Sequence, residues 1–313
     1  MDATINVDSF DFNRLPQHGL FGILGKRGTG KTQIARYILQ QLSSARTGMF
    51  AVIAGSKMVE SSWRTVVHPL YIISGLSDGA GYLGRIINQQ NRNLCKYEAR
   101  GEEIPASLGI TIVLDDCASI NSIMRSKELA YLAANGRHCH VTILILTQYY
   151  NQIITSVRCN IDIMFVLATA NAKIISKLRE EFASSTSMRL FKCIVSAVTD
   201  NFGCLVIDNR INAKTHENLK SMRIPYPFEE QRLGSQSMWH FAEAHYLNIN
   251  DRTLQQKLAR QDQLLSESGE TGDDDNDTLS HSDIVHLQKF RTTFSDKVGQ
   301  VTIKTMPSKR KID

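Results

Sequence analysis

The sequence predicts an α/β protein of three layers, in which helices cover both faces of a mainly parallel sheet. Before residue 229, six short apolar runs are nearly continuous rather than alternating, which is typical of strands buried on both faces. Helix-like stretches separate several of these runs, and this alternation favours parallel strands joined by right-handed crossovers. The chain has 313 residues, of which 42% are hydrophobic, so it can build a large core.

The expected strands are these apolar runs, in chain order: Leu20–Leu24, Met49–Ala54, Leu70–Ile73, Ile110–Leu114, Val141–Leu146 and Asp162–Leu167. A seventh run, Cys204–Ile207, is expected to extend one edge of the sheet. Helical segments are expected between several strands, including Thr32–Leu42, Ala80–Tyr97 and Asn121–Ala134.

The composition changes near residue 229, where polar and charged residues begin to dominate. The stretch 265–282 contains the acidic run Asp273–Asp277, and a segment that polar cannot bury enough surface to offset its ordering entropy. The last residues include the basic cluster Ser308–Lys311. We therefore expect an α/β domain over residues 1–228, a helical extension over 229–264, and a flexible acidic linker with a basic C-terminal tail over 265–313.

The charge balance is mildly basic, with 36 Lys and Arg against 31 Asp and Glu, a net charge of +5. This excess is compatible with a nucleic-acid partner but does not require one. The longest apolar runs, such as Val141–Leu146, are far shorter than the roughly 18–20 residues of a membrane-spanning helix. Residues 1–6 contain neither the basic nor the apolar segment of a secretion signal. We expect an intracellular protein without a membrane partner.

The strongest motif is a phosphate-binding loop that follows an apolar strand and opens a helix. It matches G-x-x-x-x-G-K-[ST], the Walker A pattern, with the residues Gly25, Lys26, Arg27, Gly28, Thr29, Gly30, Lys31 and Thr32. Glycines let successive backbone N–H groups turn toward a phosphate, and the helix start adds the positive end of its dipole. Lys31 is expected to bind the β- and γ-phosphates of ATP, and the Thr32 hydroxyl is expected to bind Mg²⁺.

An acid pair follows the strand Ile110–Leu114, which is the Walker B pattern. Asp115 is expected to hold Mg²⁺ through its water shell. Asp116 then has the position of a base that orients the attacking water. An alternative is that both acids merely cap the strand and begin a turn.

A third polar end follows the strand Val141–Leu146, in Thr147 and Gln148. If this strand lies between the other two, Gln148 faces the γ-phosphate and can sense it. The sheet is then that of a P-loop NTPase three-layer sandwich with an additional strand between the Walker A and Walker B strands. In the alternative, Gln148 only satisfies backbone groups in a loop.

Two arginines flank this third element, Arg137 before it and Arg158 after it. A guanidinium supplied by a neighbouring subunit neutralises charge on the γ-phosphate during hydrolysis, and each arginine is a candidate for that role. Surface or salt-bridge duties are the alternative for both.

Four sequence blocks together resemble one family: Gly-Lys-Arg-Gly-Thr-Gly-Lys-Thr, Leu-Asp-Asp, Gly-Arg-His-x-x-Val-Thr-x-Leu-x-Leu-Thr-Gln and Val-Arg-Cys-Asn-Ile-Asp. They look like the genome-packaging ATPases of nucleocytoplasmic large DNA viruses of the poxvirus and iridovirus type, in the FtsK–HerA superfamily of P-loop motors. The resemblance spans Gly22 to Pro227. The phosphate loop is shared by all P-loop proteins, whereas the Gly-Arg-His and Leu-Thr-Gln pairing is more particular to this family.

The resemblance implies hydrolysis of ATP with Mg²⁺ in a homo-oligomeric ring that moves double-stranded DNA into a capsid. It implies a capsid or portal-like viral partner, and action at virus assembly sites in the host cytoplasm or nucleus, or in the virion. Matching positions assign Lys31, Asp116, Gln148, Arg137 and Arg158 to catalysis, and Thr32 and Asp115 to the metal. One departure is Asp116, where many superfamily members have the longer Glu.

Three other functions remain open from the residues alone. A single-strand helicase would need aromatic platforms for stacked bases, and only 7% of the residues are aromatic. A small-molecule kinase would need an arginine-rich lid and a substrate acid after the second strand, where Glu60 is the nearest acid. A nucleotide-binding assembly module would bind ATP without useful hydrolysis.

Overall fold

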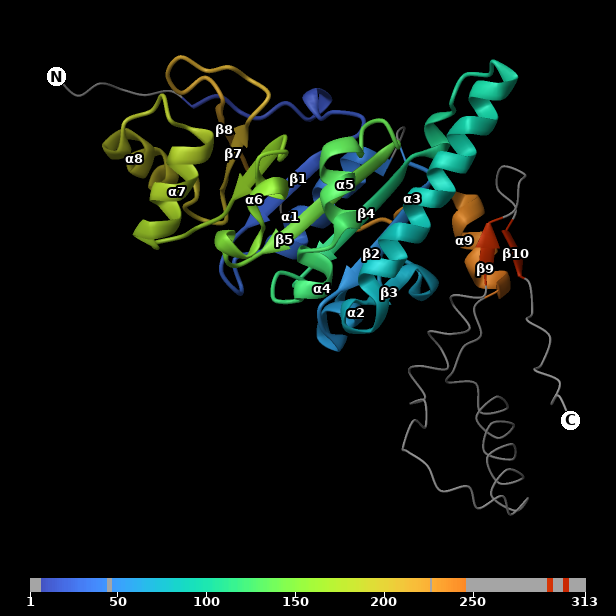
Figure 1. Ribbon diagram of the computed structural model, residues 1–313. Coiled ribbons are helices and arrows are strands. Elements are labelled where there is room, and N and C mark those ends of the chain that lie inside the picture. Colours follow the sequence, from blue (N-terminus) through green and yellow to red (C-terminus); the bar gives the residue numbers. More distant parts are fainter. Residues whose placement is uncertain (1–6, 44–46, 226, 246–291, 295–300, 304–313) are drawn as a thin grey trace, which may run out of the picture. The chain divides into compact units, whose positions relative to one another are not determined.

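The computed structural model describes residues 7–43, 47–225, 227–245, 292–294 and 301–303 (Figure 1). Its contacts divide the chain into two compact units, Met1–Gln236 and Ser237–Asp313. The first unit holds the sheet and all of the motifs above. The predicted division at residues 228, 264 and 313 stays a prediction, since most of the chain beyond His245 lies outside the described residues.

The first unit is built on one sheet of eight strands. They are β1 (Leu20–Leu24), β2 (Met49–Ala54), β3 (Ile72–Ser74), β4 (Ile110–Asp115), β5 (Val141–Thr147), β6 (Ile163–Val166), β7 (Cys204–Asp208) and β8 (Leu219–Met222). Their order is β3-β2-β4-β5-β1-β6-β7-β8, parallel from β3 to β6 and antiparallel from β6 to β8. Strand β5 lies between β1 and β4, which confirms the predicted additional strand.

Helices connect the strands of this sheet. They are α1 (Lys31–Ser43), α2 (Lys57–Trp63), α3 (Gly75–Arg100), α4 (Asn121–Met124), α5 (Lys127–Asn135), α6 (Thr155–Arg158), α7 (Ala172–Phe182) and α8 (Met188–Val198). The view in Figure 1 looks onto α3 and α5, with α1 behind the sheet. This is the three-layer α/β sandwich predicted from the sequence.

The core lies between the sheet and these helices. Alternate strand residues such as Ile112, Ile143 and Met164 form one buried cluster with side chains of α3 to α8. Residues of the opposite parity, including Phe21 and Phe165, are fully buried on the face that α1 covers. Both faces of the central strands are therefore apolar, which is why their sequences read as continuous runs.

Three local predictions need correction. The third strand is Ile72–Ser74 rather than Leu70–Ile73, because Pro69 lacks an N–H and opens a 3₁₀ turn over Pro69–Tyr71. The segment Asn121–Ala134 is two helices, since the side chain of Ser126 caps a new helix at the Leu129 N–H. The run Cys204–Ile207 is not an edge strand, because β8 pairs beyond it.

The second unit is described only in part. Helix α9 spans Gln236–His245, and two short strands, β9 (Thr292–Phe294) and β10 (Val301–Ile303), pair antiparallel. The acidic run and the basic cluster at the C-terminus lie outside the described residues. Among the helices that are described, none combines the length and the apolar character needed to cross a membrane.

Two histidine rings meet near the amino ends of β1 and β5, and they give a prediction about acid stability. His18 is 8% exposed, and its ring centroid lies 4.7 Å from that of His140. Both of its nitrogens are buried and have no hydrogen-bond partner among the residues that the structure describes. Burial, assisted by the charge of His140, lowers the pKa of His18 from 6.5 to about 4. Between these two pH values the unfolded chain takes up a proton at this residue and the folded chain does not. Lowering the pH from 7 to 4 therefore lowers the free energy of unfolding by about 3 kcal/mol.

The variant His18→Phe is expected to remove this part of the acid dependence while keeping a buried ring. Urea denaturation of the wild-type protein and the variant at pH 7, 5.5 and 4.5 measures it. The exposed His138 gives a control in His138→Phe, which should retain the wild-type slope. An unchanged slope in His18→Phe would show that this ring is not the acid-sensitive group.

Candidate nucleotide-binding site

The phosphate-binding loop lies at the carboxyl edge of the sheet, between β1 and α1. β1 ends at Leu24, and the Gly25 N–H donates to the carbonyl of Thr147 at the end of β5, at 3.2 Å. Gly28 and Gly30 have φ values of +79° and +89°, which side chains rarely adopt, so the loop needs glycine at both places. The loop therefore presents its backbone at the amino end of α1.

Lys31 is folded back over this loop. Its Nζ donates to the carbonyls of Gly25 and Lys26, at 2.9 Å each. Burial lowers the pKa of Lys31, and the nearby Asp115 and Asp116 carboxylates act against that shift. The two carbonyls thus hold the ammonium group beside the loop, near the carboxylates of Asp115 and Asp116.

Asp115 is a buried carboxylate at the last position of β4. It is 5% exposed, and its Oδ2 lies 3.5 Å from the Thr32 hydroxyl and 2.8 Å from the indole Nε1 of Trp63. Burial raises the pKa of this carboxyl, while the Trp63 hydrogen bond and the charge of Lys31 lower it. A carboxylate and a hydroxyl are hard oxygen donors, and here they lie close enough together to bind one Mg²⁺. This ion takes its other ligands from phosphates and water.

Asp116 has a different environment from its neighbour. It is exposed, whereas Asp115 is buried, and its φ of +58° is a left-handed conformation that is uncommon outside glycine. The chain turns sharply here, so the two acids differ in both burial and direction. The buried Asp115 is suited to bind a cation, and the exposed Asp116 is suited to contact a water molecule.

The turn at Asp116 depends on Gly55, and this gives a second prediction. A Cβ added at Gly55 would lie 2.1 Å from the backbone oxygen of Asp116, so the backbone of one of the two loops must move. We expect Gly55→Ala to lower the free energy of unfolding by about 1–3 kcal/mol, as overpacking does, and to lower ATP turnover by displacing the acid pair.

Thermal unfolding and phosphate release measure these two effects. The control is Gly84→Ala in α3, where the added Cβ meets, among the described residues, only the Glu128 Cγ, at 3.5 Å. That variant should be neutral or slightly more stable, because alanine favours a helix. If Gly55→Ala matches the control in both readouts, the packing of this turn does not position the acids.

Gln148 directly follows β5 and is partly buried. The register pairs Thr147 with Leu24 of β1, and Leu146 with Asp115 of β4. Gln148 therefore stands at the same sheet edge as the phosphate loop and the acid pair. The structure brings together Lys31, Thr32, Asp115, Asp116 and Gln148, five of the predicted site residues.

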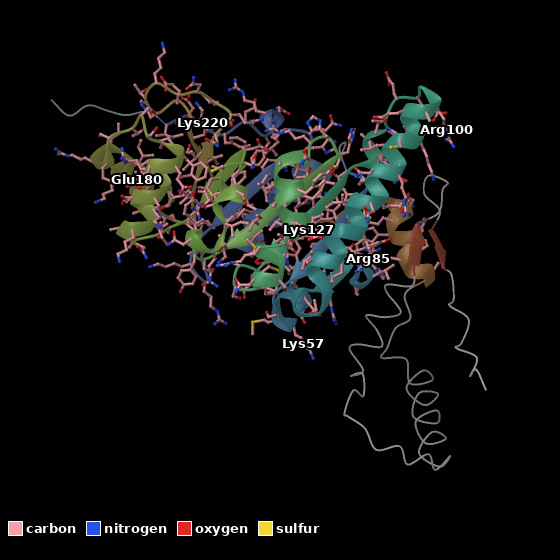
Figure 2. The ribbon with its side chains drawn as sticks, viewed as in Figure 1. Lys57, Arg85, Arg100, Lys127, Glu180 and Lys220 are labelled. Atoms are coloured by element: carbon pink, nitrogen blue, oxygen red, sulfur yellow. The ribbon has the colours of Figure 1, made fainter. Side chains whose placement is uncertain are left out.

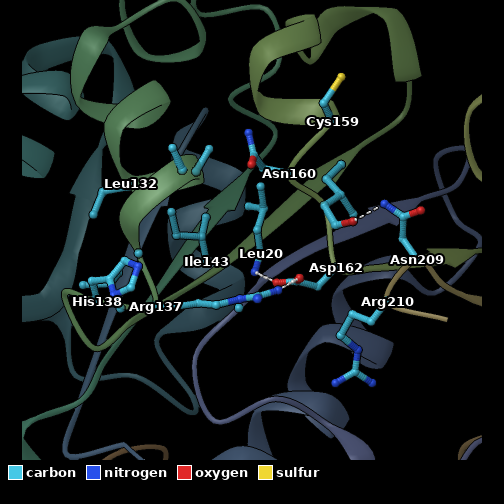
Figure 3. A pocket seen from close by; sticks show the side chains of 16 residues that line it. Leu20, Leu132, Arg137, His138, Ile143, Cys159, Asn160, Asp162, Asn209 and Arg210 are labelled. Carbon is cyan, nitrogen blue, oxygen red and sulfur yellow. Dashed lines mark hydrogen bonds and ion pairs between the residues drawn. The ribbon is translucent and has the colours of Figure 1, made fainter. Parts of the chain in front are cut away.

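Arg137 lies at the opposite edge of the sheet. Its guanidinium pairs with Asp162, whose Oδ2 also accepts from the Leu20 N–H at 2.9 Å (Figure 3). Both residues line a pocket of about 480 Å³ at the amino ends of β1 and β5, and Arg210 lines it as well. The structure does not bring Arg137 to the phosphate loop of its own chain.

Arg158 is held within the helical layer. Its Nε lies 3.3 Å from the Glu181 carboxylate on α7, and its guanidinium carbon lies 5.0 Å from the ring centroid of Tyr150. The side chain is 13% exposed. These partners are outside the phosphate loop, so Arg158 also stays away from the site of its own chain.

A comparison with known families decides the family of the chain. The family described as Poxvirus A32 protein matches residues 8–220. The chain belongs to this family. The match agrees with the large-DNA-virus resemblance seen in the motifs, and it covers every predicted site residue.

Relatives of this A32-family chain are found in Frog virus 3 and in Invertebrate iridescent virus 6. Protein 015R of Frog virus 3 is 26% identical over 227 residues, a match that covers 70% of the chain and 66% of the relative's length. Protein 075L of Invertebrate iridescent virus 6 is 25% identical over 229 residues, covering 72% and 84%. Among solved structures, the DNA-packaging ATPase B204 of Sulfolobus Turreted Icosahedral Virus is similar with a TM-score of 0.49 and 10% identity, covering 67% of the chain and 99% of B204.

Sequence reasoning missed Trp63 as a neighbour of the site. This residue ends α2 and is 52 positions away from Asp115, so no local motif links them. The sequence offers little more than a tryptophan at the end of the short helix that follows the second strand. Its contact with the acid depends on the packing of α2 against the sheet edge.

Proposed function

We propose that this A32-family protein is an ATP-driven translocase that packages double-stranded viral DNA into a capsid. The observation that carries the proposal is the convergence of the phosphate loop, the acid pair and Gln148 at one edge of the sheet, around the additional strand β5. This combination provides phosphate binding, water activation and a group that can report the γ-phosphate.

The chemistry follows from these side chains. The loop amides and Lys31 bind the phosphates of ATP and stabilise the charge that develops on the transferred group. Asp116 accepts a hydrogen bond from a water molecule and orients it in line with the γ-phosphate. When bound, Mg²⁺ neutralises phosphate charge, and Thr32 and Asp115 are the residues that would hold it.

Assembly into a ring accounts for the arginines. Neither Arg137 nor Arg158 approaches the phosphate loop of its own chain, so a role in hydrolysis requires the site of a neighbouring copy. Arg137 is 60% exposed despite its bond to Asp162, which leaves it more accessible than Arg158. We infer that Arg137 is the better candidate to act in trans.

The charge distribution supports a nucleic-acid partner. Helix α3 carries four basic residues and two acidic ones, which are Arg85, Arg92, Lys96 and Arg100 against Asp78 and Glu98. Figure 2 shows Arg85 and Arg100 along α3, with Lys127 at the start of α5 nearby. A few such contacts per subunit, repeated around a ring, bind phosphates while still allowing release in each cycle.

Phosphate release by the full-length protein tests the proposal. With Mg–ATP, duplex DNA is expected to accelerate release several-fold, and the particle mass is expected to rise to that of a ring in the presence of nucleotide and DNA. Stimulation by single-stranded DNA alone would favour a helicase, and phosphoryl transfer to a small acceptor would favour a kinase. Binding of ATP without turnover under any condition would favour an assembly module.

A further inference from the structure

Trp63 holds the carboxylate that is expected to bind the metal. Its side chain is fully buried, and its indole N–H donates to Asp115 Oδ2 at 2.8 Å. In the described part of the chain, Oδ1 of Asp115 accepts no hydrogen bond. The indole therefore fixes the plane of the carboxylate and leaves its other oxygen for a cation or for a water molecule of the cation's shell.

A second residue fixes the indole in turn. Arg36 lies on α1, one helical turn after Thr32, and its guanidinium carbon is 5.6 Å from the ring centroid of Trp63. The same guanidinium bonds the carbonyl of Ser62, the residue before Trp63. Arg36 is 8% exposed, so this contact is shielded from water. The last turn of α2 is thus tied to the helix that carries the phosphate loop.

Arg36 also binds the segment 228–235, which we name the strap and which precedes the second unit. Its Nη1 lies 2.6 Å from the Glu230 carboxylate. The strap makes further contacts along α1: the Phe228 ring packs edge-on against Tyr37, and the Gln40 side chain donates to the Glu229 carbonyl at 2.8 Å.

The far end of the strap is fixed by backbone hydrogen bonds. The Leu233 N–H donates to the carbonyl of Val66 at 2.8 Å, and the Ser235 N–H donates to that of Gly48 at 3.1 Å. Val66 lies three residues after Trp63. The strap is therefore bonded both to Arg36, which contacts the indole, and to the chain just after Trp63.

We propose that Trp63 is a positioning residue for magnesium binding by Asp115, and that Arg36 couples its position to the strap. The inference rests on the proposed function, because it takes Asp115 as the metal-binding acid. Hydrogen-bond donors behind a metal ligand orient that ligand, and their loss typically weakens metal binding about 10–100-fold. Since coupling between sites is reciprocal, magnesium–nucleotide binding and the strap contacts should stabilise each other.

A purely structural role for Trp63 makes a different prediction. If the indole only fills the core, its replacement lowers stability and weakens the binding of nucleotide and of Mg²⁺ together. If it positions Asp115, the effect is specific to the metal, and nucleotide binding without metal is preserved. A cavity made beside the indole, with its N–H intact, separates these two cases.

The experiment measures the anisotropy of the fluorescent nucleotide mant-ADP bound to the full-length protein, in EDTA and in a Mg²⁺ titration. For Trp63→Phe we expect mant-ADP affinity in EDTA within about twofold of wild type and Mg²⁺ affinity lower by about 10–100-fold. The control Val67→Ala creates a cavity at a fully buried neighbour and should keep the wild-type Mg²⁺ affinity. Glu230→Gln, which weakens the hold on Arg36, should give a smaller loss in the same direction.

A second readout uses the indole itself and does not require Trp63→Phe to fold. The chain has two tryptophans, so Trp239→Phe leaves Trp63 as the single emitter. Its fluorescence should change on adding Mg²⁺ with ADP, and that change should vanish when Asp115→Asn is added.

Three results would overturn the inference: equal Mg²⁺ affinity in Trp63→Phe and wild type, an equal loss in Val67→Ala, or a Trp63 emission that ignores Mg²⁺ when wild type binds it. Failure of the proposed function looks different, because it appears in the wild-type protein as phosphate release that duplex DNA does not accelerate, whatever the Mg²⁺ affinities of the variants.

Discussion

Lys31→Ala is expected to slow ATP hydrolysis by about 10²–10³ and to weaken nucleotide binding. The ammonium group of Lys31 donates hydrogen bonds to the loop carbonyls of Gly25 and Lys26, and it lies near the acid pair. Removing a preorganised donor that faces developing charge typically costs about 10²–10³ in rate. The affinity for ATP should fall about 10–100-fold as well, since a charged hydrogen bond contributes about 1.5–3 kcal/mol.

Phosphate release and mant-ATP binding measure these two losses. Lys192→Ala, an exposed lysine on α8, is the matched control and should keep both values. Hydrolysis within a few-fold of wild type in Lys31→Ala would mean that the phosphates bind elsewhere than the loop at residues 25–32.

The substitution Asp116→Asn is expected to stop ATP hydrolysis while leaving nucleotide binding intact. Asp116 is exposed at the edge of the site, and the amide cannot accept a proton from the attacking water. General-base catalysis contributes about 10²–10⁴ in rate, so turnover should fall by that factor. Binding of Mg–ATP should be unchanged, because Asp115 and Thr32 remain to hold the metal.

Asp116→Glu adds a test of reach. Glu keeps a carboxylate on a side chain one methylene longer, so Asp116→Glu should retain a substantial part of the activity that Asn removes. The isosteric control is Asp11→Asn at an exposed turn, which should behave as wild type. Substantial hydrolysis in Asp116→Asn would assign water activation to another group.

The sequence predicted the centre of this protein well because its signals there are local. Strands covered on both faces must be continuously apolar, so β1, β2, β4 and β5 could be located almost to the residue. The phosphate loop needs glycine and lysine at fixed spacing, and the additional strand could be inferred from the polar end at Gln148. These features depend on short stretches of backbone.

The features that were missed depend on packing between distant segments. Trp63 reaches Asp115 because α2 packs against the sheet edge. β8 is a strand because it pairs antiparallel with β7 at the edge of the sheet. The placement of Arg137 beside Asp162 at the opposite sheet edge also follows from the strand order, which the arginine's own neighbours do not encode.

A structure with Mg²⁺ and a non-hydrolysable ATP analogue tests the central claim most directly. We expect the β- and γ-phosphates within hydrogen-bond distance of the 25–32 amides and of Lys31 Nζ. The metal should lie about 2.0–2.1 Å from the Thr32 hydroxyl, with Asp115 beside it directly or through one water. An analogue bound away from this loop, for example in the pocket beside Arg137, or a metal that contacts neither residue, would contradict the account.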